Sequence, residues 1–442
     1  MIDKIIEKIK DKEIAILGFG REGRSSYEFI RKHLPSKHIT IIDKNDFSKE
    51  LGEDKNLSFV SGDNYLDGLD KYELVFKTPG ISLFGKDTHN VKITSQIELL
   101  LEVHRDKVIG ITGTKGKSTT TSLTYQILKQ NGVNCVLTGN IGIPTFDLLE
   151  EADEDTYFVI EMSSHQLETL EVSPHIGVIL NLFQDHLDHT GSVEEYHKAK
   201  LNMFKYQEAN DYMIYYKDNE TLAEKIKNGN YKGKELTVST SSKANIYLEN
   251  NTVIYNDELV FDKNLKRNLL GDHNFINIMV AFMIGKLFEI DTNKILEVVS
   301  DFKSLEFRLE HFATVNDVKY YVDTLATIPE ATIEAIEAIP DINTLIFGGM
   351  DRGISYEGFA DALKNSKVEH FICMPKTGYE IAKELPQDRV ILAETLEEAS
   401  RIAKEVTKKG TSCILSPAAA SYEYFKNYEE KGNKFKEYIT KE

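Results

Sequence analysis

A glycine-rich segment at residues 110–120, G-I-T-G-T-K-G-K-S-T-T, has the residue types that hold phosphate groups. Glycines let a turn wrap closely, so that backbone N–H groups and the N-terminus of the next helix face phosphate oxygens. Lys117 adds a positive charge, and a neighbouring hydroxyl can reach Mg²⁺. Ile111 stands where the first glycine of the usual P-loop spacing would be. The position between a strand-like and a helix-like run nevertheless predicts a phosphate-binding loop, with ATP as its ligand.

Two later segments carry carboxylates and imidazoles directly after apolar runs. Glu161 ends T-Y-F-V-I-E, and Asp185, His186, Asp188 and His189 follow I-G-V-I-L-N-L-F. Taken alone, Glu161 could be an acid in an ordinary turn, and the His/Asp cluster could be a solvated loop or a zinc site. Beside a P-loop, the segments together favour a magnesium site shared with the ATP phosphates, because Mg²⁺ prefers oxygen ligands.

A second glycine pattern, G-F-G-R-E-G at residues 18–23, follows the apolar run E-I-A-I-L. It predicts a tight turn and a helix N-terminus at which a diphosphate can bind, as in dinucleotide-binding folds. Asp43 lies twenty residues after Gly23, where such folds bind a ribose hydroxyl. These residues leave a nicotinamide-dependent oxidoreductase open, and the P-loop leaves a non-catalytic binding module open.

The elements that position these segments follow from length and hydropathy pattern. A chain of 442 residues is long enough for two or three domains. Strand-like and helix-like runs alternate from residue 13, again from 107 and again after 307, which is typical of parallel α/β units. Short alternating runs between 211 and 265 predict an antiparallel appendage, and a long amphipathic helix is expected at 274–288.

We therefore expect an α/β protein of three domains. They are a Rossmann-like domain (1–98), a central P-loop domain with a parallel sheet and a small antiparallel sheet (99–305), and a C-terminal Rossmann-like domain (306–442). The chain has 53 Lys and Arg against 71 Asp and Glu, a net charge of −18, which argues against binding to nucleic acid or a membrane surface. Three cysteines and no signal-peptide or membrane-spanning pattern predict a cytoplasmic protein.

The order of these and further segments resembles the Mur ligases, and the resemblance extends along the whole chain. The segments are T-G-T-K-G-K-S-T (112–119), G-N-I-G (139–142), E-M-S-S-H-Q-L-E (161–168), D-H-L-D-H (185–189), Y-H-K-A-K (196–200), G-D-H-N-F-I-N-I-M-V-A (271–281), F-R-L-E (307–310), F-G-G-M-D-R-G (347–353), S-P-A-A-A-S (416–421) and F-K-N-Y-E-E-K-G-N-K-F (425–435).

The resemblance implies an enzyme that forms an amide bond with ATP through an acyl phosphate. It is closest to the branch that adds D-glutamate to UDP-N-acetylmuramoyl-L-alanine in peptidoglycan precursor synthesis. The implied partners are that UDP-linked substrate, glutamate and ATP, and the implied state is a monomer. An L-glutamate-adding relative, another Mur ligase or a folylpolyglutamate-type ligase is the alternative.

The resemblance also implies a role for individual residues. The implied catalytic residues are Lys117, His186 and Lys200. Those near ATP are Gly113, Thr114, Lys115, Gly116, Lys117, Ser118, Thr119, Asn274, Arg308 and Asp323. Those that hold two Mg²⁺ ions are Ser118, Glu161, His186 and Lys200, the last as a carbamate that bridges to a metal. Those for the UDP-linked substrate are Gly20, Arg21, Glu22, Asp43, Thr78, Gly80 and Asn140, and those for glutamate are Thr327, Arg352, Ser421 and Tyr428.

One segment departs from the family pattern. Residues 323–329 are D-T-L-A-T-I-P, and Leu325 stands where D-glutamate-adding members generally have a lysine. Pro329 stiffens the same loop. We expect D-glutamate as the substrate, with L-glutamate as the alternative that this departure raises.

Overall fold

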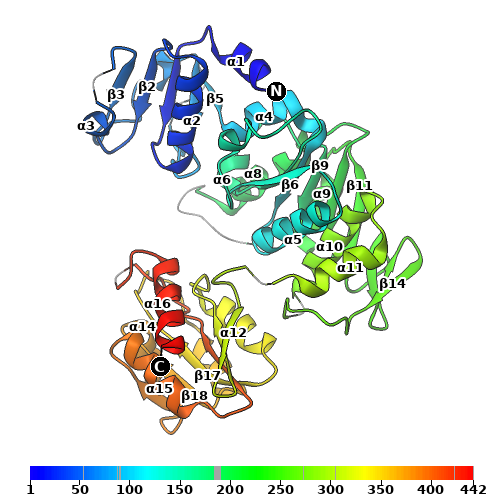
Figure 1. The fold of residues 1–442 in the computed structure, drawn as a ribbon, viewed down its shortest axis with the longest axis vertical. Helices are drawn as coiled ribbons and strands as arrows, with labels where there is room; N and C mark the ends of the chain where they lie inside the picture. The colour runs from blue at the N-terminus through cyan, green and yellow to red at the C-terminus, as the bar shows by residue number, and fades with distance from the viewer. Residues whose placement is uncertain are drawn as a thin grey trace. The chain divides into compact units, whose positions relative to one another are not determined.

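The computed structural model describes residues 1–52, 54–86, 88, 91–183, 191–271, 273–303, 305–422 and 424–441. Within them the chain forms two compact units, which can be followed by colour in Figure 1. The larger unit comprises Met1–Leu265 and Ile276–Val299, and the smaller unit comprises Lys266–Phe275 and Ser300–Glu442. The larger unit contains two sheets and the smaller unit contains one. The predicted three-domain division, with boundaries at 98 and 305, stays a prediction.

The first sheet has five parallel strands in the order β3-β2-β1-β4-β5. Strands β1, β2 and β4 are buried along their whole length, as the continuous apolar runs of a covered parallel sheet require. The order reverses beside β1, so a crevice opens at the carboxyl ends of β1 and β4. The elements are α1 (Ile2–Ile9), β1 (Ile14–Leu17), α2 (Arg21–His33), β2 (Ile39–Ile42), α3 (Ser48–Leu51), β3 (Leu57–Val60), β4 (Leu74–Lys77) and β5 (Lys92–Thr94).

The second sheet has nine strands in the order β14-β13-β12-β11-β10-β9-β6-β8-β7. Its strands are β6 (Val108–Thr112), β7 (Cys135–Gly139), β8 (Tyr157–Glu161), β9 (Ile176–Ile179), β10 (Tyr212–Tyr216), β11 (Lys234–Ser239), β12 (Ile246–Glu249), β13 (Thr252–Tyr255) and β14 (Glu258–Asp262). The helices around it are α4 (Gln96–His104), α5 (Lys117–Gln130), α6 (Ser164–Leu167), α8 (Val193–Lys205), α9 (Glu220–Asn228), α10 (His273–Leu287) and α11 (Thr292–Asp301).

The prediction of a separate antiparallel appendage at residues 211–265 was wrong in part. Strand β10 pairs parallel to β9, and β11 pairs parallel to β10, so both extend the central sheet, because helix α9 supplies the crossover that parallel strands need. Strand β12 still pairs parallel to β11, and only the β12–β13 and β13–β14 pairs are antiparallel. Their tight turns place Asn250, Asn251, Asn256 and Asp257 at positive φ, the conformation that short hairpin turns require. The result is one mixed sheet rather than two.

The long helix predicted near residue 274 is present as α10, but it is not amphipathic. Every residue from 278 to 284 is fully buried, so the helix is apolar on all sides. A helix of this kind belongs to a protein core rather than to a surface. In the described part of the chain, no helix meets the length and apolarity that crossing a lipid bilayer demands.

The smaller unit has six strands in the order β15-β16-β20-β17-β18-β19, and only β15 is antiparallel to its neighbour. The α/β alternation predicted after residue 307 is therefore confirmed. The elements are β15 (Glu310–Val315), β16 (Val318–Val322), α12 (Pro329–Ala338), β17 (Ile342–Phe347), α13 (Phe359–Lys364), β18 (His370–Cys373), α14 (Thr377–Ala382), β19 (Val390–Leu392), α15 (Leu396–Val406), β20 (Ser412–Leu415) and α16 (Tyr428–Thr440).

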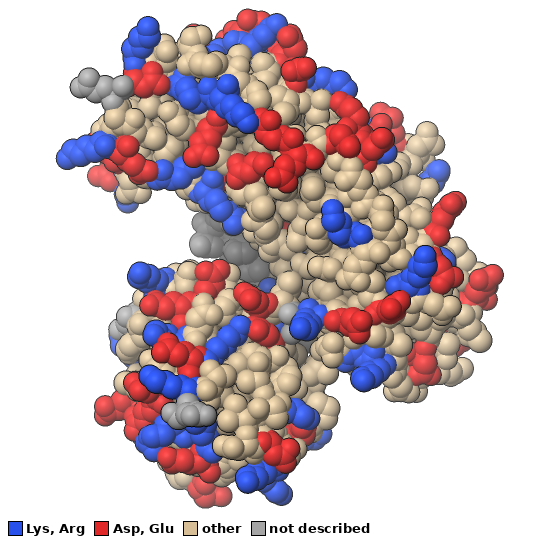
Figure 2. All heavy atoms as spheres, viewed as in Figure 1, with Lys and Arg blue, Asp and Glu red and all other residues tan. Residues whose placement is uncertain are grey.

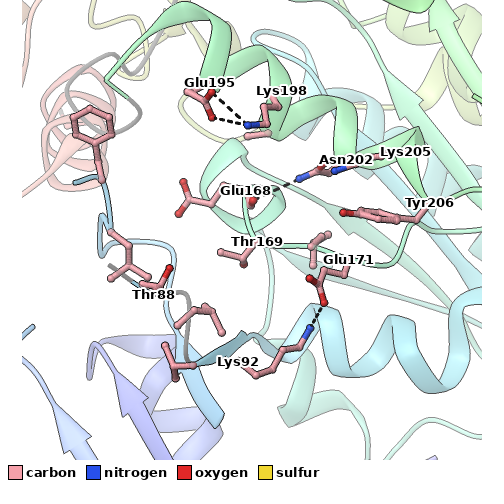
Figure 3. Close-up of a pocket in the computed structure, with 16 residues that line it drawn as sticks. Thr88, Lys92, Glu168, Thr169, Glu171, Glu195, Lys198, Asn202, Lys205 and Tyr206 are labelled. Carbon is pink, nitrogen blue, oxygen red and sulfur yellow. Dashed lines mark hydrogen bonds and ion pairs between the residues drawn. The ribbon is translucent and has the colours of Figure 1, made fainter. Parts of the chain in front are cut away.

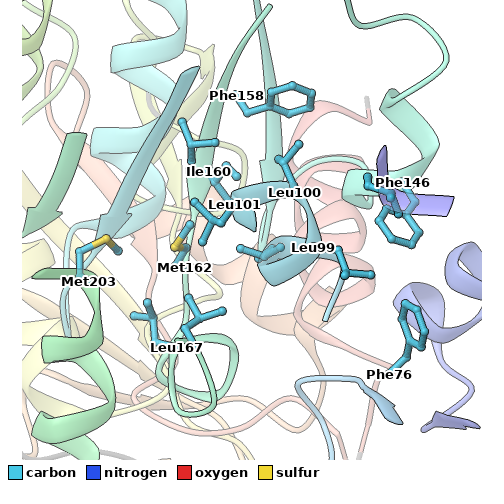
Figure 4. Packing of buried hydrophobic residues seen from close by; sticks show 14 of the residues in the cluster. Phe76, Leu99, Leu100, Leu101, Phe146, Phe158, Ile160, Met162, Leu167 and Met203 are labelled. Atoms are coloured by element: carbon cyan, nitrogen blue, oxygen red, sulfur yellow. The ribbon is translucent and has the colours of Figure 1, made fainter. Parts of the chain in front are cut away.

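One apolar cluster joins the two sheets of the larger unit (Figure 4). Helix α4 contributes Leu99, Leu100 and Leu101, which are buried together with Phe76 of the first sheet and Phe158 of the second. Buried apolar contacts of this kind are the main stabilising term in folding. The two sheets thus belong to one compact unit.

The surface carries both signs of charge. Figure 2 shows Lys and Arg interspersed with Asp and Glu over the face in view. With a net charge of −18, an anionic ligand is attracted by local groups rather than by the surface as a whole.

The turn between β1 and α2 depends on glycine, and a substitution tests this. A Cβ at Gly23 would lie 2.0 Å from the carbonyl oxygen of Gly18, whereas a Cβ at Gly20 would meet nothing within 4 Å. We expect Gly23→Ala to lower the free energy of unfolding by about 1–3 kcal/mol, measured by urea denaturation. Gly20→Ala is the control and should leave it nearly unchanged. Equal stability of the two variants would contradict this packing.

Candidate functional site

The predicted P-loop forms the turn between β6 and α5. Gly113 and Gly116 have φ angles of 156° and 85°, in the region that favours glycine. A Cβ at Gly116 would lie 2.6 Å from Oδ1 of Asn277 on α10. Helix α5 begins at Lys117, so the predicted Ser118 and Thr119 lie in its first turn. The structure thus gives the segment the strand-turn-helix geometry that places backbone amides toward a phosphate.

Asn181 holds the P-loop, and the sequence analysis missed it. The backbone N–H groups of Thr114 and Lys115 donate to its Oδ1 at 3.0 and 2.9 Å, and its Nδ2 donates to the Lys115 carbonyl at 3.1 Å. Asn181 follows β9, and β9 is paired with β6. The sequence does show a polar residue, Asn181, after an apolar strand-like run. It does not show that this strand lies beside the strand that leads into the P-loop.

The two predicted catalytic lysines, Lys117 and Lys200, meet at one carbonyl of the P-loop. The Nζ of Lys117 donates to the Gly113 and Thr114 carbonyls at 3.0 and 2.9 Å. The Nζ of Lys200, on α8, donates to the same Gly113 carbonyl at 2.9 Å and to Oγ1 of Thr112 at 3.3 Å. Lys200 is only 1% exposed. The structure therefore places both amines at the predicted phosphate site.

Glu161 ends β8 beside the P-loop strand, opposite Ile111. Its Oε1 accepts a hydrogen bond from Nδ2 of Asn140 at 2.7 Å. Its Oε2 is buried and has no hydrogen-bond partner among the described residues, and the side chain as a whole is 1% exposed. A buried oxygen of this kind is costly unless a donor or a cation satisfies it, so the position fits a metal ligand. A further predicted metal ligand, His186, lies outside the described residues together with Asp185, Asp188 and His189.

A cavity of about 310 Å³ lies at the carboxyl ends of β1, β2 and β4. All seven residues predicted for the UDP-linked substrate line it, and they are Gly20, Arg21, Glu22, Asp43, Thr78, Gly80 and Asn140. Asp43 shapes the glycine turn, because its Oδ2 accepts the N–H of Phe19 at 2.8 Å. Asn140 lines this cavity and also bonds to Glu161, so the cavity lies directly beside the P-loop strands.

The electrostatics of this cavity centre on Glu22, in the first turn of α2. Burial raises the pKa of its carboxyl group to about 7, against the opposing effects of a hydrogen bond with Gln166 and the charges of Lys77 and Arg21. Gln166, which the sequence analysis did not single out, lines the same cavity. Its Oε1 accepts hydrogen bonds from the N–H and the hydroxyl of Ser163 at 3.0 and 3.1 Å, in the capping box that begins α6.

A larger cavity, of about 590 Å³, contains none of the predicted site residues (Figure 3). Four of its charged side chains form two ion pairs: Nζ of Lys92 lies 2.6 Å from Oε2 of Glu171, and Nζ of Lys198 lies 3.3 Å from Oε2 of Glu195. Such pairs leave little unsatisfied charge for a ligand. We do not count this cavity as a candidate site.

In the smaller unit, the predicted glutamate residues follow three adjacent parallel strands. Thr327 comes after β16, Ser421 after β20 and Arg352 after β17, and Tyr428 begins α16. The turns after β17 and β20 are joined by a bridge between Met350 and Ala420. The structure therefore brings these predicted residues to one edge of one sheet, where α/β proteins bind ligands.

Two of the predicted nucleotide residues, Arg308 before β15 and Asp323 after β16, lie at the same edge of this sheet. Asp323 follows β16, and burial raises the pKa of its carboxyl group to about 7. It accepts hydrogen bonds from the N–H of Leu309 and from Oγ of Ser416, both at 3.0 Å, and the charge of Arg308 opposes the shift. Asn274 is buried at the start of α10 and donates to the Leu270 carbonyl.

Two segments of the chain match known protein families. Residues 111–285 match the Mur ligase middle domain, and residues 307–419 match the Mur ligase glutamate ligase domain. Over an alignment of 461 positions, the chain is 36% identical to a UDP-N-acetylmuramoylalanine–D-glutamate ligase of Clostridium botulinum (strain Langeland), with 99% of this chain and 98% of the relative covered. The chain belongs to the Mur ligase family.

Other relatives agree with this membership. The Clostridium kluyveri enzyme of the same name is 33% identical to this Mur ligase, with 99% and 98% of the two chains covered. Among solved structures, MurF of Thermotoga maritima in complex with ADP has a TM-score of 0.60 at 16% identity, covering 96% of this chain and 95% of that one. MurC of the same organism has a TM-score of 0.60 at 18% identity, covering 96% and 98%. These structural likenesses concern the fold.

The raised pKa of Glu22 gives this Mur ligase a testable dependence of stability on pH. Between about pH 4.5 and 7 the folded protein keeps a proton that the unfolded chain has released, so the free energy of unfolding should fall as the pH rises through this range. Glu22→Gln should remove that part of the slope in urea unfolding from pH 4 to 8.

The matched control is Glu28→Gln, which changes an exposed acid on the same helix and should keep the wild-type slope. If Glu22→Gln unfolds with the same pH dependence as the wild type, the carboxyl group of Glu22 titrates normally.

Proposed function

We propose that this Mur ligase joins glutamate to UDP-N-acetylmuramoyl-L-alanine with ATP, and that D-glutamate is the expected enantiomer. The observation that carries the proposal is the match over 99% of the chain to enzymes named UDP-N-acetylmuramoylalanine–D-glutamate ligase. The convergence of all seven predicted substrate residues on one cavity supports it independently.

The N-terminal cavity is the proposed site of the UDP-linked substrate. It lies where the strand order reverses, and its floor is the turn of G-F-G-R-E-G at the N-terminus of α2. A helix N-terminus with free amides favours a diphosphate. Asn140 on the cavity wall contacts Glu161, so the far end of a bound substrate is directed toward the P-loop strands. This arrangement supports a Rossmann-like role for the first sheet and a P-loop role for the second.

The chemistry needs two steps. The substrate carboxylate attacks the γ-phosphorus of ATP, the bond to the bridging oxygen breaks, and ADP leaves. The amine of glutamate, having lost a proton, then attacks the acyl carbon, and phosphate leaves from the tetrahedral intermediate. Positioning and charge neutralisation account for most catalysis in such reactions. The P-loop amides and the amine of Lys117 are the groups that hold the phosphates.

The residues present fit a magnesium site. Glu161 offers an unsatisfied carboxylate oxygen, and Ser118 offers a hydroxyl in the first turn of α5. These two would hold one ion and His186 a second, and bound Mg²⁺ would neutralise charge on the phosphates. Lys200 would join the site as a carbamate, formed when its uncharged amine bonds to the carbon of CO₂ and releases one proton. The nearby amine of Lys117 is a cation that favours this anionic form.

The smaller unit is the proposed glutamate site, with the hydroxyls of Thr327 and Ser421, the guanidinium of Arg352 and the ring of Tyr428. Arginine suits a dicarboxylate because it can bind a carboxylate through two parallel hydrogen bonds. Leu325 packs against an apolar cluster of this unit and supplies no cation. This observation keeps L-glutamate as the second candidate substrate.

The first test measures phosphate released from ATP by the purified full chain. We expect release only when UDP-N-acetylmuramoyl-L-alanine and glutamate are both present, because each step consumes one of them. Parallel reactions with D- and L-glutamate assign the enantiomer. Absence of release with both enantiomers and the intact UDP-linked substrate would contradict the proposed function.

The metal site is tested by Glu161→Gln, which keeps the size of the side chain and removes its charge. We expect the Mg²⁺ concentration at half-maximal activity to rise about tenfold or more, since metal ligands bind as carboxylates. Glu171→Gln, an exposed acid beside the other cavity, is the control and should titrate as the wild type does. An unchanged Mg²⁺ titration for Glu161→Gln would remove Glu161 from the metal site.

A further inference from the structure

Lys431 is a buried lysine in the first turn of α16 for which the proposed function has no role. It is 1% exposed, and its Nζ donates to the carbonyl oxygen of Gly348 at 3.1 Å. In the described part of the chain it forms no ion pair with a carboxylate. Lysine is rarely buried in this way, because its amine must be desolvated and its stem immobilised. The cost of burying this lysine suggests that its side chain has a specific role in the protein.

The backbone at Lys431 is fixed by its neighbours. A Cβ at Gly432 would lie 2.3 Å from Cδ1 of Phe307, so α16 packs directly against the loop before β15. Oγ1 of Thr324 donates to the carbonyl of Tyr428 at 2.9 Å, which ties the same turn of α16 to the segment after β16. The side chain of Lys431 therefore extends from a part of α16 whose backbone is held in place.

The other end of the bond is the turn after β17, at Gly348. The N–H of Gly348 donates to the Pro417 carbonyl at 2.9 Å, and the N–H of Met350 donates to the Ala420 carbonyl at 3.0 Å. These bonds attach the turn to the segment after β20. A Cβ at Gly349 would lie 3.6 Å from Nζ of Lys431, so the amine lies against the turn itself. Lys431 thus links α16 to a turn that leads, four residues after Gly348, to Arg352.

We propose that Lys431 is a positioning residue of the amino-acid site, where its hydrogen bond to Gly348 holds the turn that carries Arg352. The inference rests on the proposed function, because it assigns this edge of the sheet to glutamate. Arg352 is exposed on the turn, and Oγ of Ser421 on the adjoining segment is buried without a hydrogen-bond partner among the described residues. A fixed turn keeps the distance between the guanidinium and that hydroxyl constant, so that both can contact the same bound amino acid.

The charge of the amine fits a positioning role. Burial lowers the pKa of Lys431 to about 7, so near neutral pH much of the population is uncharged. An uncharged amine still donates a hydrogen bond to a carbonyl. It gives little attraction to a dicarboxylate, which leaves that task to Arg352.

The test compares Lys431→Met with Lys431→Arg, which keeps a donor, and with Lys434→Met, an exposed lysine on the same helix that pairs with Glu437. We expect Lys431→Met to raise the KM for glutamate about tenfold, with KM values for ATP and the UDP-linked substrate within about twofold of wild type. Lys431→Arg should recover most of the loss, and Lys434→Met should match the wild type.

Hydrogen exchange of the amides at 348–353 gives a readout that does not need activity. We expect it to be about tenfold faster in Lys431→Met than in the wild type, with exchange in β18 unchanged. Unchanged exchange, or faster exchange with an unchanged KM for glutamate, would overturn the positioning role. A wild-type enzyme that releases no phosphate with glutamate would contradict the proposed function instead, while hydrogen exchange would still report whether Lys431 holds the turn.

Discussion

The backbone amides that follow a parallel strand must find partners, and in this chain a polar side chain after a neighbouring strand provides them. Asp43, after β2, accepts the N–H of Phe19, after β1. Asn181, after β9, accepts the N–H groups of Thr114 and Lys115, after β6. An amide that is buried without a partner costs about 1–3 kcal/mol, so these bonds decide which turn conformations are stable. Both turns then lead directly into a helix, α2 after the first and α5 after the second.

This constraint explains how one protein contains two glycine-rich turns with different tasks. Both follow parallel strands of one compact unit, and both lead into a helix whose N-terminus attracts a phosphate. The cavity at the first turn is also lined by Gly139 at the end of β7, Asn140 after it and Gln166 of helix α6, which belong to the second sheet and the segments around it. The glycine pattern alone suggested a nicotinamide cofactor. Membership of the Mur ligase family favours a UDP-linked substrate there, since the second turn is the one suited to ATP.

Much of the local structure could be predicted from the sequence. Continuous apolar runs located the parallel strands, and the glycines located both turns, because these features depend on residues that are near one another in the chain. Helix α9 was missed between two short strands, so the extent of the parallel sheet was misjudged. The burial of α10 on all sides was also missed, because an apolar face and a fully apolar helix differ only in what packs around them.

Some residues of the candidate sites could likewise be predicted from the sequence, and others could not. The glycine motifs and the spacing of Asp43 are local features, so Lys117 and Asp43 could be predicted from them. Thr78, Gly80 and Asn140 could be predicted only through the resemblance to the Mur ligases. Asn181 and Lys431 could not, because each acts on a turn that is distant in sequence: Asn181 reaches residues 114 and 115, and Lys431 reaches residue 348. The pKa of Glu22 likewise depends on burial and on Lys77 and Gln166, which no pattern around residue 22 indicates.

The most direct test of two separate nucleotide sites is isothermal titration calorimetry of the full chain with ADP and with UDP-N-acetylmuramoyl-L-alanine. The wild type should bind one molecule of each at the same time. Lys117→Met should weaken ADP binding about tenfold or more and leave the UDP-linked ligand unaffected, and Asp43→Ala should do the reverse. Competition between the two ligands for one site, or loss of both in either variant, would contradict the assignment of the two glycine-rich turns to two different nucleotides.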